Sequence, residues 1–188
     1  MEIRKAAVMH GGKAALCGAG AVHSVKRYGE ARAFYKSGDD GLKEDTVMYE
    51  VYQYTEEDDS HPGHLSWGLT VLYPLTVGGE CNMTRGHFHR DRECAEVYCG
   101  AEGEGLLLLM DEEGRTWAEE VRPGSVHYIK GRLAHRLVNT GAGPLKVAAC
   151  WPTAAGHDYE SVERQPFGWR VYRGDSGLVY KKEGEDSE

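Results

Sequence analysis

Short runs of alternating or apolar residues, separated by turn residues, dominate the chain from residue 46 onward. Residues 46–54 (TVMYEVYQY) alternate and are rich in β-branched and aromatic side chains, and residues 66–73 (SWGLTVLY) repeat the pattern. The spacing of about 8 to 12 residues between turn signals is typical of β-sandwiches and β-barrels. The pattern therefore predicts an all-β domain. Further predicted strands cover residues 95–99, 106–111, 116–121, 126–129, 135–139 and 145–151.

The two ends of the chain are less regular. Residues 21–35 (AVHSVKRYGEARAFY) are compatible with a short strand or a helical turn, and residues 169–174 and 177–182 with two closing strands. The acidic end, EGEDSE, is predicted to be disordered. No linker divides the chain, so we expect a single domain. Its expected parts are an N-terminal arm at 1–45, a barrel core at 46–160 and a C-terminal extension at 161–188.

Charge and cysteine content narrow the possible partners. The net charge of -8 argues against nucleic acid and against an anionic membrane surface. No apolar stretch approaches the roughly 18 residues of a membrane span, and the mixed-charge start does not resemble a signal peptide. The five cysteines form no C-x-x-C pair, which predicts free thiols in a reducing cytoplasm. An anionic substrate stays compatible, because a metal ion and a few donors can reverse the field inside a pocket.

The candidate chemistry lies in the segment TRGHFHRDRECAEVY. His87 and His89 are two residues apart and point to the same face if they lie on a strand. Glu96 follows across a charged turn, and His135 stands on a later predicted strand. Three imidazoles and one carboxylate leave open positions on an octahedral ion, and such mixed ligands suit iron, manganese, nickel, cobalt or zinc. We predict one divalent metal ion per subunit, with Fe²⁺ as first choice and Mn²⁺, Ni²⁺, Zn²⁺ or Co²⁺ as alternatives.

Three longer segments resemble one known family. The strings TRGHFHRDRECAEVYCGAEGEGLLLL, AHRLVN and WPTAAGHDY resemble the cupin-type glucose-6-phosphate isomerases of archaea and some bacteria, over about residues 45–160. The resemblance implies a cupin double-stranded β-helix, a barrel related to jelly rolls, and a homodimer. General cupin spacing after H-x-H would select Glu93 as the carboxylate ligand, whereas the isomerase pattern selects Glu96. We choose Glu96 and keep Glu93 as the alternative.

The resemblance also implies an activity, the metal-dependent interconversion of glucose 6-phosphate and fructose 6-phosphate in glycolysis or gluconeogenesis. Glu96 is the best placed carboxylate for proton transfer, and His157 could assist ring opening or proton transfer. Proton transfer through an enediol and a hydride shift both stay open at this point. The use of mannose 6-phosphate stays open as well.

Binding of the sugar phosphate needs neutral donors or a cation, and hydroxyl and amide donors can hold a phosphate without net charge. Tyr52, on the first strong strand, is a further candidate from the sequence. Trp151 stands where some relatives are expected to have tyrosine, and His127 is the remaining histidine with the best claim to a role. By resemblance, the substrate-binding residues are Thr70, Thr84, the N–H of Gly86, Tyr98 and Tyr159.

Two other classes of function compete with the isomerase. One is a non-catalytic cupin that binds a sugar or sugar phosphate, and the other is a different metal-dependent cupin enzyme such as an oxygenase. A barrel alone does not separate them, because one fold supports many functions. The E-V-Y after the histidines, Thr70, Thr84 and the A-G-H-D-Y string favour the isomerase.

Overall fold

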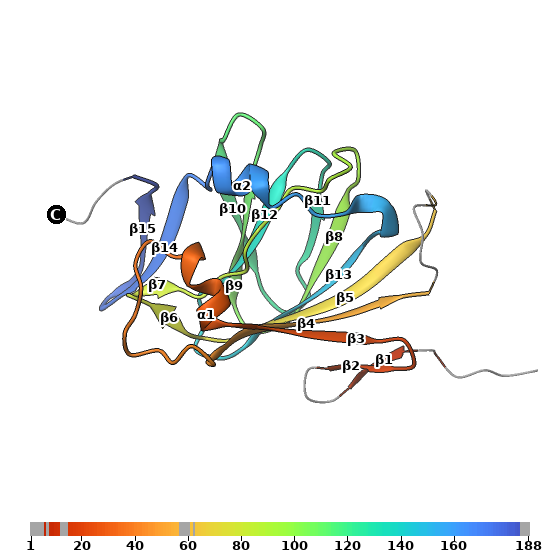
Figure 1. Ribbon diagram of the computed structural model, residues 1–188, viewed down its shortest axis with the longest axis horizontal. Helices are drawn as coiled ribbons and strands as arrows, with labels where there is room; N and C mark the ends of the chain where they lie inside the picture. The colour runs from red at the N-terminus through yellow and green to blue at the C-terminus, as the bar shows by residue number, and fades with distance from the viewer. Residues whose placement is uncertain (1–5, 7, 12–14, 57–60, 62, 185–188) are drawn as a thin grey trace, which may run out of the picture.

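The computed structural model describes residues 6, 8–11, 15–56, 61 and 63–184, and about half of them lie in antiparallel strands (Figure 1). Four sheets are present in this part of the chain. The largest contains, in spatial order, β11 (Val126–Ile129), β8 (Glu96–Glu102), β13 (Leu145–Pro152), β5 (Leu65–Leu72), β4 (Val47–Thr55) and β3 (Val22–Arg27). A second sheet contains β10 (Thr116–Val121), β9 (Gly105–Met110) and β12 (Ala134–Asn139).

The apolar run at residues 106–111 is the central strand of the smaller sheet. Every residue of β9 is buried, as the continuous run predicted, because β10 and β12 pair with its two edges. Leu107 and Leu137 pack into one core with Leu72 and Val147 of the large sheet. The two sheets therefore share a single apolar interior, as a jelly-roll barrel requires.

The large sheet presents a different set of side chains on each face, because successive residues of a strand point in opposite directions. On β5, Leu69 and Val71 point outward and form a separate apolar cluster with Ala148 of β13. The hairpin of β1 (Val8–Gly11) and β2 (Ala15–Gly18) lies beside this outer face, where β2 approaches β4 and β5 (Figure 1). The inner face, which includes Thr70 of β5, lines a cavity inside the barrel.

Both less regular ends contain regular structure. The stretch 21–35 includes strand β3, helix α1 (Tyr28–Ala31) and the 3₁₀ turn η1 (Arg32–Phe34), so both predicted alternatives occur in it. β3 pairs with β4 as the edge of the large sheet. The closing strands are β14 (Trp169–Gly174) and β15 (Gly177–Lys182), which confirms their prediction. They form the remaining sheet with β7 (Glu80–Cys81) and β6 (Thr76–Val77).

The cysteines confirm the prediction of free thiols: all five are free, and only Cys81 is buried. No helix in the described ranges is long and apolar enough to cross a membrane. Residues 1–5 and 185–188, which hold the start of the chain and most of the acidic end, lie outside the described residues.

Candidate active site

The segment that contains His87 and His89 is held in place by isolated β-bridges. His87 pairs with His135 of β12, and Phe88 pairs with Asp158. The His135 N–H donates to the His87 carbonyl at 3.0 Å. These bridges place His87 and His89 on the inner side of the barrel, directly beside His135.

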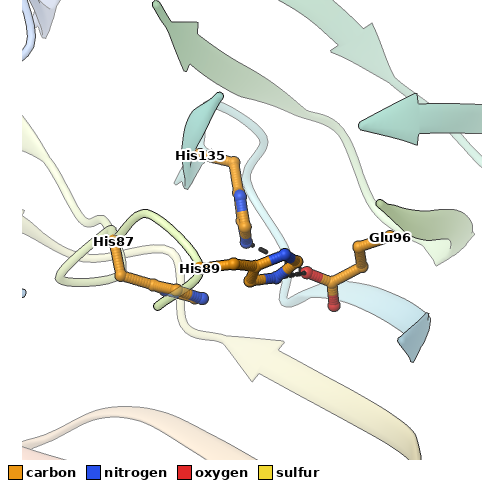
Figure 2. A group of neighbouring side chains, drawn as sticks. All are labelled: His87, His89, Glu96 and His135. Carbon is orange, nitrogen blue, oxygen red and sulfur yellow. Dashed lines mark hydrogen bonds and ion pairs between the residues drawn. The ribbon is translucent and has the colours of Figure 1, made fainter. Parts of the chain in front are cut away.

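The four predicted ligands converge on one point (Figure 2). Their ligand atoms all lie within 4.8 Å of one another. Glu96 Oε2 is 3.2 Å from His89 Nε2 and 3.0 Å from His135 Nε2. β8 supplies Glu96, β12 supplies His135, and the extended segment supplies the other two ligands. Strands from both sheets therefore contribute to the cluster.

Two observations show that this group fits a divalent metal ion. His89 Nδ1 lies 2.9 Å from the Cys94 carbonyl, which fixes the proton on Nδ1 and leaves Nε2 free to coordinate. His87 Nε2 is buried without a hydrogen-bond partner among the described residues, an arrangement that is costly unless something else occupies the position. Imidazole nitrogen with one carboxylate oxygen is a donor set for first-row transition metals.

The electrostatics favour an ionised Glu96 and a neutral His87. At His89, burial would lower the pKa, but Glu96 and the Cys94 carbonyl outweigh it and raise the pKa. Burial alone would raise the pKa of Glu96, but the imidazoles of His135 and His89, at 3.0 and 3.2 Å from its Oε2, outweigh burial and lower the pKa to about 2. Burial, together with the neighbouring imidazoles, lowers the pKa of His87 well below its ordinary value. Neutral imidazole and ionised carboxylate are the forms that bind metal.

The cluster opens into a cavity of about 490 Å³ on the inner face of the large sheet. This volume suits a small ligand. Nearly all of the residues that the sequence assigned to substrate or catalysis line it together with the four cluster residues. They are Thr70, Thr84, Gly86, Tyr98, His157 and Tyr159.

Tyr52 requires a correction, because the structure places it on the opposite face of the sheet. Its ring stacks on His23 with centroids 4.3 Å apart, and its hydroxyl donates to Glu50 at 3.0 Å. Its strand neighbours Val51 and Gln53 line the cavity instead. The alternation of side chains along β4 explains the difference: a residue one position away from a cavity residue points outward.

The alternative carboxylate, Glu93, also lies away from the cluster. Its side chain is largely exposed and pairs with Arg132 at 2.5 Å. The turn before His135 holds Arg132 at a φ of 65°, and its N–H donates to the Arg92 carbonyl at 2.7 Å. The group of potential ligands contains Glu96 and excludes Glu93.

His157 and Tyr159 cover the cluster from the segment between η2 (Thr153–Ala155) and α2 (Glu160–Arg164). The ring of His157 lies 4.4 Å from that of His87, and Tyr159 stacks parallel to His157 at 5.6 Å. The segment is held by Asp158, which pairs with Arg92 at 2.5 Å. Burial lowers the pKa of His157 and raises the pKa of Tyr159. A neutral imidazole and a protonated phenol therefore face the cavity at neutral pH.

Several cavity residues escaped the sequence analysis. Arg85 and Lys26 add two cations to the neutral donors that the sequence named. Arg85 could have been found in the sequence, because it directly precedes Gly86 in the motif. Lys26 could not, because it reaches the cavity only when β3 joins the sheet. Trp151, which the sequence did single out, lines the cavity as well, over Gly68, where a Cβ would lie 2.9 Å from the indole ring.

His127 does not line this cavity. It is buried and lies between Glu119 Oε2, 2.6 Å from its Nδ1, and Ser125 Oγ, 2.9 Å from its Nε2. Both ring nitrogens have partners, so the residue links β10 and β11. We assign it a structural role.

The barrel topology and the inward-facing group of three histidines and one glutamate define the protein as a cupin with a site suited to a metal ion. Residues 26–187 match the family model described as "Glucose-6-phosphate isomerase (GPI)". The chain belongs to this family of aldose-ketose isomerases.

Named relatives agree with the family assignment. The glucose-6-phosphate isomerase of Thermococcus kodakarensis is 38% identical over 88% of this chain and 84% of its own length. That of Pyrococcus horikoshii is 41% identical over 76% of this chain and 70% of its own. Among solved structures, an oxalate oxidase is distantly similar, with a TM-score of 0.45, 13% identity, and coverage of 74% of this chain and 55% of the other.

Proposed function

We propose that the cavity isomerises glucose 6-phosphate and fructose 6-phosphate with one divalent metal ion bound by His87, His89, Glu96 and His135. The observation that carries the proposal is that one cavity joins the four-ligand cluster to a set of hydroxyl, amide and cationic donors. The cluster suits the reacting end of an open-chain sugar, and the donors suit its phosphate. Fe²⁺ is our first choice of ion.

The metal would supply Lewis-acid polarisation of the sugar carbonyl. We assign the proton transfer between C1 and C2 to Glu96. Its Oε2 faces the histidines, while its other oxygen points away from them (Figure 2). We assign to His157, which is neutral and lies beside His87, the exchange of a proton with the ring oxygen during ring opening.

The phosphate end is assigned to Thr70, Thr84, Tyr98 and the Gly86 N–H. The Leu137 N–H donates to Thr84 Oγ1 at 3.0 Å, which leaves the Thr84 hydroxyl proton free to donate into the cavity. Burial raises the pKa of Tyr98 well above its ordinary value, so its phenol stays a donor. Thr70→Val is expected to raise KM for fructose 6-phosphate with little change in kcat.

The central test is a coupled assay of fructose 6-phosphate conversion, before and after a chelator, with Fe²⁺, Mn²⁺, Ni²⁺ and Zn²⁺ returned one at a time. Loss of activity with chelator and recovery with an ion support the proposal and rank the ions. No activity with any ion, in protein that binds metal by elemental analysis, would favour a sugar-binding cupin.

A pair of isosteric variants tests the proposed base. Glu96→Gln is expected to lower kcat by about 100-fold or more, because a positioned general base contributes at least that much. Glu93→Gln is the matched control, since Glu93 is an exposed carboxylate on the neighbouring turn. Substantial activity in Glu96→Gln would remove Glu96 from the catalytic role.

We also propose that the protein acts as a homodimer in the cytoplasm. Val97, Val126 and Tyr128 lie together on the outer face of β8 and β11 and expose apolar surface, which favours association. Five free thiols suit a reducing compartment. Light scattering would test the oligomeric state, and a monomeric mass would refute the dimer.

A further inference from the structure

We call the proposed phosphate-binding donors, Thr70, Thr84, Tyr98 and the Gly86 N–H, the phosphate cradle. Arg136 is a buried guanidinium directly behind this cradle. It follows His135 on β12 but points to the other face, and it does not line the cavity. Among the described residues it forms no ion pair, and its Nε has no hydrogen-bond partner. Its one hydrogen bond runs from Nη2 to the carbonyl of Arg85, at 2.6 Å. A buried charge with so few partners is costly, which indicates that it serves something other than stability.

The Arg85–Gly86 peptide links this buried arginine to the cavity. In a trans peptide, the carbonyl of one residue and the N–H of the next point in opposite directions. Because Arg136 holds the Arg85 carbonyl on its own side, the Gly86 N–H points away from Arg136, and Gly86 itself lines the cavity. Within the described part of the chain this N–H donates to no protein group. The backbone at Gly86 has a φ of 76°, in the left-handed region that favours glycine.

Phe167 holds Arg136 in place from the C-terminal extension. Its fully buried ring lies against the guanidinium, with the central carbon 4.8 Å from the ring centroid. Gly86 is enclosed by the same two side chains: a Cβ there would lie 2.9 Å from Phe167 Cε2 and 3.1 Å from Arg136 Nε. The ring, the guanidinium and the glycine loop therefore pack as one unit.

We propose that Arg136 is a positioning residue that holds the Gly86 N–H toward the cavity, so that this N–H binds the phosphate group of the substrate. Arg136 acts through the Arg85 carbonyl and does not touch the substrate. Its positive charge, behind the same peptide, adds to the attraction for a dianion. The inference rests on the proposed phosphate cradle, and it gives the C-terminal extension, through Phe167, a part in substrate binding.

The test compares two variants. Arg136→Met keeps a long side chain but removes the positive charge and the hydrogen-bond donor, whereas Arg136→Lys keeps the charge and a donor. The readouts are Ki for inorganic phosphate as a competitive inhibitor, KM and kcat for fructose 6-phosphate, and metal content. Arg136→Met is expected to raise Ki and KM about tenfold, because a hydrogen bond to a charged acceptor is weakened, with kcat and metal content close to the parent values. Arg136→Lys is expected to recover part of the loss.

Two control variants separate the possible outcomes. Arg173→Met removes another guanidinium that donates to loop carbonyls, those of Thr140 and Gly141, and it should leave Ki unchanged. If Thr70→Val raises Ki and folded Arg136→Met does not, the inference about Arg136 is wrong while the cradle stands. If neither variant changes Ki, the cradle itself is wrong.

A folding defect in Arg136→Met does not remove the test. Phe167→Leu keeps an apolar side chain and removes the ring that holds the guanidinium, so Ki should rise in it as well. An unchanged Ki in both Phe167→Leu and Arg136→Lys would overturn the proposal.

Discussion

Replacing Gly86 by alanine tests how tightly the proposed phosphate cradle is built. Gly86 has a φ of 76°, in the left-handed region that L side chains rarely adopt. A Cβ at this position would also lie 2.9 Å from Phe167 Cε2, 3.1 Å from Arg136 Nε and 3.2 Å from Arg136 Cβ. Neither neighbour can move freely, because both are buried. The substitution therefore adds steric overlap to backbone strain.

The two contributions have separate magnitudes. Left-handed backbone costs a residue with a Cβ about 1–2 kcal/mol, and an extra methyl group in a packed core costs about 1–3 kcal/mol. Gly86→Ala is thus expected to lower the free energy of unfolding by about 2–5 kcal/mol. Any relief of the overlap displaces the Gly86 N–H, so KM for fructose 6-phosphate should rise as well. Urea denaturation and steady-state kinetics on the same preparation measure both effects.

Gly124→Ala is the matched control. Gly124 has a φ of 86°, but nothing lies within 4 Å of the position that its Cβ would take. Its alanine variant should therefore show only the strain, about 1–2 kcal/mol, and unchanged KM. The entropic effect of glycine replacement on the unfolded chain is the same in both variants and cancels. Equal losses of stability at the two positions would refute the reasoning, because they would mean that the cradle relaxes without cost.

Three further predictions concern the ligands and the far face of the sheet. His135→Ala should lower the metal bound per chain in elemental analysis, and full stoichiometry would contradict the ligand assignment. Tyr52→Phe should leave kcat and KM unchanged, because its hydroxyl bonds to Glu50 outside the cavity; a raised KM would place the residue at the site. The metal-free protein should lose stability as the pH falls below about 6.5, because the unfolded chain takes up a proton that the depressed pKa of His87 keeps off the folded state. The loss attributable to His87 is about 1.4 kcal/mol per pH unit in urea denaturation, and a His87→Asn variant with the same pH dependence would refute the attribution.

The cluster of potential metal ligands was predictable because its signals are local. His87 and His89 share a face through their spacing, and Glu96 and His135 stand beside turns that return the chain. The strands were predictable for the same reason, since alternation and apolar runs reflect burial directly. The apolar strand β9 and the closing strands β14 and β15 lie at the positions that the pattern indicated.

Other features were decided only by tertiary pairing. Alternation along β4 shows that neighbouring residues face opposite sides, but not which side faces inward. The sequence therefore offers Tyr52 as a binding candidate, whereas Val51 lines the cavity. In the sequence, nothing distinguishes Arg136 from an ordinary charged residue next to His135. Its position behind Gly86, against Phe167, depends on chain segments far apart in the sequence that meet only when the barrel closes. Local periodicity records which residues share a face, whereas contacts between distant segments come from packing, and the sequence pattern does not contain them.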